Sequence, residues 1–207
     1  MTKESKSYWE SYYSSHRDPV PPSLFAEFVC PFLRQGNRLL ELGCGNGRDS
    51  VFFAEHHIRV NALDQCSQEI GYLNKKFAAI DHLEFVEGNM EAPPFSNKFD
   101  YIYSRFSLHS INADAETAVF DWSYDLLEKN GLFFIEVRSI HDALYGQGTE
   151  VGHHEFVTDH YRRFIELEEM IAKAANSGYN LLYSLESQGL APYKTEDPMV
   201  IRLIFQK

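Results

Sequence analysis

Apolar and polar positions along residues 38–138 follow an order in which short apolar runs alternate with longer amphipathic segments. The apolar runs have the length of strands and fall at 38–42, 58–63, 83–87, 99–104 and 132–138. The longer segments have apolar residues at helical spacing and fall at 47–57, 67–79 and 114–128. Ser67 is expected to cap the second of these helices, and Asn130-Gly131 to end the third. Strands that alternate with helices favour a parallel sheet with helices on both faces, so we predict a doubly wound α/β fold.

The two ends of the chain differ from this middle part. Residues 5–34 have many aromatic side chains at helical spacing, and Ser23 suits the N-cap of a second helix there. Residues 165–177 have the pattern of an amphipathic helix. Two strand-like runs follow at 180–187 and 199–206, and the short, turn-rich link between them predicts an antiparallel hairpin.

A glycine-rich turn is the most informative local feature. The first apolar run leads directly into Gly43-Cys44-Gly45-Asn46-Gly47, and a helical pattern begins immediately afterwards. Glycine adopts positive φ and lets a ligand lie against bare backbone, although the turn could also do no more than join a strand to a helix. A dinucleotide fingerprint would need its third glycine at position 48, which is Arg48 here.

An acid follows the next strand at the spacing expected for ribose binding. Asp64 lies 21 residues after Gly43, close to the offset of about 20 residues at which such an acid is found. Its carboxylate can accept hydrogen bonds from both hydroxyls of a vicinal diol. A helix N-cap is the alternative role of Asp64, but Ser67 is better placed for it.

Taken in order, these segments resemble the class I S-adenosylmethionine (SAM) methyltransferases, closely over residues 38–140 and more weakly toward the C-terminus. Within that superfamily, the Gly-Cys-Gly-x-Gly-Arg loop is similar to that of small bacterial enzymes of the tellurite-resistance and thiopurine type. The resemblance implies a Rossmann-like sheet of seven mostly parallel strands with an antiparallel last strand. It implies SAM as cofactor and S-adenosylhomocysteine as product. The cofactor-binding residues that it implies are Glu41, Gly43, Cys44, Gly45, Gly47, Asp64, Gln65, Asn89, Met90 and Ser104.

The resemblance also assigns roles to two regions beside the glycine turn. Asn89 would hydrogen-bond the edge of the adenine and Met90 would pack on its face, with an ordinary turn as the alternative. The N-terminal helices of such enzymes lie over the cofactor, where a Trp or Tyr shields the sulfonium. Packing against the sheet is the alternative role of any one of those aromatic residues.

Residues 139–163 are predicted to form a mobile lid that binds the methyl acceptor. They make a long, glycine-containing loop after the fifth strand, and loops of this length are commonly functional. Arg162 and Arg163 suit a carboxylate or phosphate, unless a local acid pairs with one of them. Arg105, which follows the fourth strand, would be a further substrate-binding residue if the acceptor is an anion.

Three residues are predicted to act in catalysis. His160 and Tyr161 would orient or deprotonate a hydroxyl of the acceptor. His109 follows the fourth strand, where it would act as a general base or cap a short turn. No metal site is expected, because no carboxylate or cysteine completes an obvious ligand set with His153 and His154.

Composition limits the remaining possibilities. The 207 residues suit one domain, comprising an N-terminal helical cap (1–35), a cofactor-binding core (38–140), the acceptor lid (139–163), and a C-terminal helix with a hairpin (164–207). A net charge of −11 argues against a nucleic-acid partner. The absence of a long apolar segment or signal peptide, together with an odd count of three cysteines, predicts a cytoplasmic protein without membrane contact or disulfides.

We therefore expect an enzyme that transfers a methyl group from SAM to a small acceptor, for which the arginines favour an anion. The acceptor's oxygen, nitrogen or sulfur would displace the methyl group in line, and the protein would be a monomer or homodimer. One alternative is a regulatory module that binds SAM or a nucleoside without catalysis. An NAD(P)-dependent oxidoreductase is disfavoured by Arg48 and by the absence of a Tyr-x-x-x-Lys set.

Overall fold

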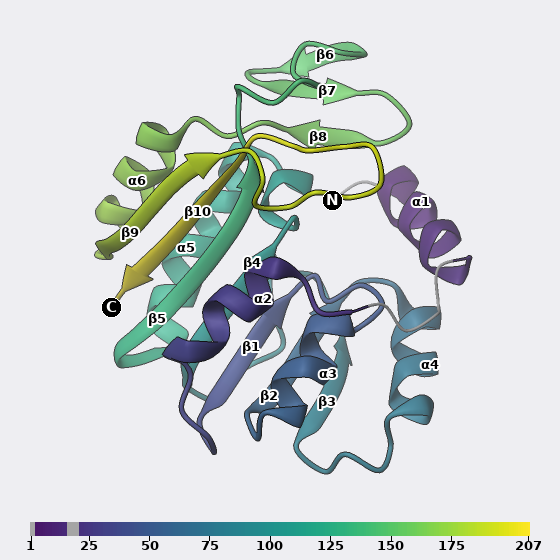
Figure 1. The fold of residues 1–207 in the computed structure, drawn as a ribbon, viewed down its shortest axis with the longest axis vertical. Coiled ribbons are helices and arrows are strands. Elements are labelled where there is room, and N and C mark those ends of the chain that lie inside the picture. The colour runs from purple at the N-terminus through teal and green to yellow at the C-terminus, as the bar shows by residue number, and fades with distance from the viewer. Residues whose placement is uncertain (1–2, 16–20) are drawn as a thin grey trace.

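The computed structural model describes residues 3–15 and 21–207 and contains a seven-stranded sheet (Figure 1). The strand order is β3-β2-β1-β4-β5-β10-β9. The strands are β1 (Arg38–Leu42), β2 (Arg59–Asp64), β3 (Leu83–Glu87), β4 (Phe99–Arg105), β5 (Leu127–Arg138), β9 (Asn180–Ser187) and β10 (Val200–Gln206). The first five are parallel, and β10 is antiparallel to both β5 and β9. The predicted fold class and the predicted hairpin are confirmed.

Helices cover both faces of this sheet. The helical elements are α1 (Lys3–Ser14), α2 (Leu24–Val29), η1 (Cys30–Phe32), α3 (Arg48–Glu55), α4 (Ser67–Lys76), η2 (Leu108–Ser110), α5 (Ala113–Leu126) and α6 (Leu167–Asn176). Neighbouring residues of a strand point to opposite faces. Along β4, Tyr103 therefore packs in one cluster with Phe53 of α3, whereas Ile102 packs in the other with Phe120 of α5.

Local capping predictions had mixed outcomes. Ser23 is the N-cap of α2, and its side chain accepts a hydrogen bond from the Ala26 N–H. The expectation for Ser67 is wrong, because Cys66 is the N-cap and Ser67 is the first helical residue. Asn130-Gly131 does not end the third helix either. That helix stops at Leu126, because Leu127 is already buried and paired with Phe99 of the sheet.

Residues 139–163 form more structure than the expected loop. They contain the small antiparallel sheet β6-β7-β8, made of Thr149–Gly152, Glu155–Val157 and Tyr161–Arg163. Phe156 of β7 is buried and makes edge contacts with Tyr145 and Phe164. This aromatic packing gives the segment a core of its own, so the expected loop is corrected to a segment that contains a small sheet, and its role as a mobile lid stays a prediction.

The helix α1 lies between α4 and the connection that leads into β8 (Figure 1). Residues 1–2 and 16–20 of the expected N-terminal cap lie outside the described residues. None of the described helices combines the length and the apolar character that a bilayer crossing requires.

Candidate functional site

A cavity of about 700 Å³ lies at the carboxyl ends of β1, β2 and β4. Its size is within the range of about 300–1,000 Å³ that is usual for ligand pockets. Open α/β sheets bind their ligands at this edge. The walls come from the glycine turn, the segments after β2, β3 and β4, the helix α1, the residues before β8, and the loop between β9 and β10.

The glycine turn brings bare backbone to the cavity. Gly43 and Gly45 have φ values of +72° and +55°. A Cβ at Gly43 would lie 2.6 Å from Ser107 Cβ, and one at Gly45 would lie 2.5 Å from Tyr13 Oη. Gly47 instead packs against Phe85 in the core and does not line the cavity. The first two glycines are therefore required by close approach at the site, and the third by helix–strand packing.

Asp64 is fixed beside this turn by two backbone hydrogen bonds. Its Oδ2 accepts from the Gly45 N–H at 2.9 Å, and its Oδ1 accepts from the Cys66 N–H at 2.9 Å. Each carboxylate oxygen has a second lone pair. The side chain lines the cavity and is 8% exposed. The geometry of the Asp64 carboxylate therefore fits a diol as ligand. Removing this carboxylate would also remove the acceptor that holds the glycine turn in place.

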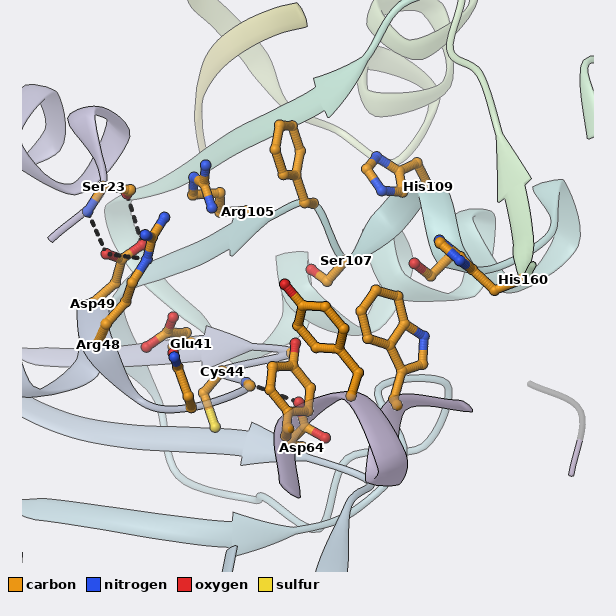
Figure 2. Close-up of a pocket in the computed structure, with 18 of the residues that line it drawn as sticks. Ser23, Glu41, Cys44, Arg48, Asp49, Asp64, Arg105, Ser107, His109 and His160 are labelled. Carbon is orange, nitrogen blue, oxygen red and sulfur yellow. Dashed lines mark hydrogen bonds and ion pairs between the residues drawn. The ribbon is translucent and has the colours of Figure 1, made fainter. Parts of the chain in front are cut away.

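Two further acids lie at the same end of the cavity (Figure 2). Glu41 accepts a hydrogen bond from the Ser50 hydroxyl, and burial, followed by the charge of Asp49, raises its pKa well above the usual range. Asp49 accepts from the Ser23 N–H at 2.8 Å and from the Tyr103 hydroxyl at 2.8 Å. It thus connects α2, α3 and β4 around the pocket.

His109 lies at the opposite end, on η2. Its Nδ1 is 3.3 Å from the backbone N–H of Arg138, which donates to it. A neutral imidazole that accepts at Nδ1 has its proton on Nε2. Burial, followed by the charges of Arg138 and Arg162, lowers the pKa of His109 well below its ordinary value. His109 is therefore a neutral hydrogen-bond donor in this arrangement.

Four arginines line the cavity, each with an acidic neighbour. Arg48 Nε lies 3.7 Å from Asp49. Arg105 Nε donates to Glu136 at 2.9 Å, and Arg162 lies 3.5 Å from Asp159. Arg138 donates from one nitrogen to Asp142 at 3.0 Å and from the other to Glu196 at 2.9 Å. Asp142 is almost fully buried, with 1% of its side chain exposed, whereas the Glu196 side chain is 57% exposed.

Aromatic side chains of α1 form the wall over the cavity. The Tyr8 hydroxyl donates to Asp159 at 2.9 Å, and the Tyr8 ring stacks on His160 with centroids 4.4 Å apart. Trp9 approaches His160 edge-on at 5.1 Å. Burial lowers the pKa of His160, and its Nδ1 lies 3.0 Å from Asp159 without the angle of a hydrogen bond.

Most of the predicted site residues come together around this cavity. Those that line it are Glu41, Gly43, Cys44, Gly45, Asp64, Gln65, Asn89, Met90, Arg105, His109, His160 and Arg162. Those that do not are Gly47, Ser104, Tyr161 and Arg163. Ser104 is fully buried and shares a hydrogen bond with Ser107 at 2.6 Å.

Strand alternation explains why two residues near β8 lie away from the cavity. His160 and Arg162 face it, whereas the adjacent residues Tyr161 and Arg163 do not. Arg163 is buried, pairs with Glu116 of α5, and donates from Nε to the Ile111 carbonyl at 3.1 Å. Burial raises the pKa of the Tyr161 hydroxyl. The expected arginine pair is therefore divided between a pocket residue and a structural one.

The sequence interpretation missed several lining residues. Asp49 follows the glycine turn directly, and the acid inside Arg48-Asp49-Ser50 was the available signal. Arg138 ends β5 and was detectable as a charged residue at the carboxyl end of a strand. Tyr193 and Glu196 belong to the loop between β9 and β10, and no local pattern marks them.

Comparison with known proteins agrees with this geometry. Residues 39–131 match a family model described as a methyltransferase domain. One relative is a protein of Geobacillus sp. (strain WCH70) that is named as a methyltransferase on a provisional basis. It is 28% identical to this chain over 147 residues, and the match covers 67% of this chain and 58% of that protein. EEF1A lysine methyltransferase 4 of Bos taurus is 28% identical over 112 residues, which are 50% of this chain and 44% of that protein. The chain spans about half the length of these curated relatives.

A solved structure supports the fold. It is the 1,6-didemethyltoxoflavin-N1-methyltransferase of Burkholderia thailandensis, with bound 1,6-didemethyltoxoflavin and S-adenosylhomocysteine. It has a TM-score of 0.76 and 19% identity, and the match covers 98% of this chain and 86% of that chain. Residues 39–131 are thus similar to the methyltransferase-domain family, and the strand order, the glycine turn and the solved structure together support the fold of the class I SAM-dependent methyltransferases for this chain.

Proposed function

We propose that this chain transfers the methyl group of SAM to a small anionic acceptor by in-line displacement. When bound, SAM supplies an electrophilic methyl group on a positively charged sulfur. Catalysis would then come mainly from holding the two reactants in line, which the cavity between the glycine turn and η2 would do.

The proposed cofactor residues lie around the glycine turn. Gly43 and Gly45 offer backbone to which a ligand can lie close. The remaining lone pairs of Asp64 suit the two ribose hydroxyls. Asn89 and Met90 line the cavity and would flank the adenine.

The observation that carries the proposal is the placement of charged side chains along the cavity. Glu41, Asp49 and Asp64 line the glycine end, where Arg48 lies beside Asp49, and Arg138 and Arg162 line the wall near η2. At the glycine end, burial and then the charge of Asp64 raise the pKa of the Cys44 thiol. At the η2 end, burial and then the charge of Arg138 lower the pKa of His109. A cationic cofactor at the first end and an anionic acceptor at the second would each lie next to opposite charge.

If the anionic atom of the acceptor is itself the nucleophile, no general base is needed, since that atom has no proton to lose. His109 is poorly suited to take a proton, because Nδ1 accepts from Arg138 and Nε2 is protonated. We assign it instead as a donor to the acceptor. His160 is the proposed base if the acceptor bears a proton.

Glu196 is proposed to occupy part of the acceptor position in the free protein. Its exposed carboxylate holds one nitrogen of Arg138, and the buried Asp142 holds the other. An acceptor anion can replace the exposed acid more easily than the buried one. Glu196→Gln should therefore lower the KM of the acceptor and leave the affinity for S-adenosylhomocysteine unchanged.

The test is a screen of carboxylates, phosphate esters and neutral metabolites with SAM carrying a labelled methyl group. We expect label to enter anionic compounds only. Arg138→Gln should abolish that transfer, while Arg59→Gln, an exposed arginine outside the cavity, should not. Labelling of neutral or lysine-containing acceptors alone, with Arg138→Gln as active as the wild type, would overturn the anion site. Cofactor binding without any transfer would favour the non-catalytic module.

A further inference from the structure

We infer that His153, His154 and Glu169 form a binding site for a divalent transition-metal ion such as Zn²⁺, separate from the methyl-transfer cavity. One ligand atom of each residue lies within 4.8 Å of the other two. Over residues 3–15 and 21–207, this is the only group of three His, Cys, Asp or Glu side chains gathered in this way. None of the three lines the cavity.

Two elements distant in sequence bring the ligands together. His153 and His154 are the two turn residues between β6 and β7, where Gly152 pairs with Glu155. His154 has a φ of +59°, and the two imidazole rings lie with centroids 3.8 Å apart. Glu169 comes from the first turn of α6. It supplies the carboxylate that completes the group, which the sequence around the histidines did not identify.

The distances suit an ion of this class. Imidazole nitrogen and carboxylate oxygen are common zinc ligands. Two ligands at about 2.1 Å from a tetrahedral ion lie about 3.4 Å apart. The gap between His153 Nε2 and Glu169 Oε1 is 3.7 Å, so small side-chain rotations would bring both into the coordination shell.

His154 also has the kind of partner that orients a metal ligand. Its Nδ1 lies 2.8 Å from the Tyr145 hydroxyl, which leaves Nε2 for the ion. Metal-ligating histidines usually have their second ring nitrogen hydrogen-bonded in this manner. With three protein ligands, water would complete the shell.

A bound ion would join the β6–β7 turn to α6. The same small sheet includes β8, which is preceded by Asp159 and His160 at the edge of the cavity. The ion would therefore stabilise the small sheet that positions the cavity edge, and it would take no part in methyl transfer. The inference does not depend on the proposed function.

The test uses the untagged chain after treatment with a chelator. Titration with Co²⁺, followed by its visible absorption, and with Zn²⁺, followed by calorimetry, should show one ion bound per chain. His154→Asn and Glu169→Gln should each weaken binding by about 10-fold or more. Asn is chosen at position 154 because it tolerates positive φ.

The chain offers a matched control in His56 and His57. They are also consecutive, and His57 has a φ of +64°, but they belong to no such group of three ligands among the described residues. The double variant His56→Gln/His57→Asn should bind both ions like the wild type. The inference is overturned if the wild type binds neither ion, if binding survives His154→Asn and Glu169→Gln, or if the control abolishes it.

Discussion

Replacing Gly45 by alanine tests whether the backbone at this position contacts the cofactor. The control variant described below has the same backbone strain without a contact at the site. Gly45 has a φ of +55°, and the new Cβ would lie 2.5 Å from Tyr13 Oη. Since ordinary contact begins at 3.4 Å, Tyr13 would have to move by about 0.9 Å, the difference between the two distances. A side chain in the left-handed region costs about 1–2 kcal/mol, against a total stability of about 5–15 kcal/mol. Gly45→Ala should therefore remain folded with the Tyr13 side chain displaced.

The expected effect on function is larger than the effect on stability. A displacement of about 1 Å in a group that positions reactants costs about 100-fold in rate. The added methyl group would also lie where the cofactor is proposed to meet bare backbone. We expect the dissociation constant of S-adenosylhomocysteine to rise by at least about 10-fold, which corresponds to about 1.4 kcal/mol.

Gly36→Ala is the matched control for this variant. Gly36 has a φ of +82°, and a Cβ there would meet nothing within 4 Å. The two variants should lose similar stability in urea denaturation, while calorimetry should show weakened S-adenosylhomocysteine binding for Gly45→Ala alone. Equal affinity of the two variants would refute the reasoning that Gly45 contacts the ligand.

Three other predictions concern Asp64, the two arginines of β8, and His109. Asp64→Ala should weaken S-adenosylhomocysteine binding by about 1.5–3 kcal/mol in calorimetry, and it should also lower stability, since two backbone N–H groups lose their acceptor. Arg163→Gln should destabilise the chain by about 1.5–3 kcal/mol in urea denaturation, because it breaks a buried hydrogen bond to Glu116. Arg162→Gln should instead raise the acceptor KM with little change in stability. Stability should fall as the pH drops below about 6.5, because the lowered pKa of His109 means that the unfolded chain binds a proton that the folded chain does not. His109→Gln should weaken this dependence in denaturation between about pH 7.5 and 5.5, and an unchanged pH profile would contradict the assignment.

The sheet and the cofactor side of the cavity were predictable because their signals are local. Each strand is a short apolar run, and the chemistry-bearing residues Gly43, Gly45 and Asp64 come directly after β1 or at the end of β2. Parallel strands place their carboxyl ends at one edge, so these residues meet without any knowledge of the distant chain.

The acceptor side was less predictable because it depends on pairing between distant segments. Whether Arg162 or Arg163 faces the cavity is decided by the register of β8 against β7, which a three-residue strand does not reveal. Glu196 reaches Arg138 only because β10 pairs with β5 and brings the preceding loop to the cavity. The helix ends also depended on tertiary packing, as burial of Leu127 in the sheet shows.

Calorimetric titration with S-adenosylhomocysteine, run in parallel with NADH, tests the central claim most directly. The two glycines and the Asp64 carboxylate are the residues proposed to hold the adenosyl part of the sulfonium cofactor. We predict that S-adenosylhomocysteine binds at one site per chain and that NADH does not bind. Tight NADH binding without any binding of S-adenosylhomocysteine would contradict the account.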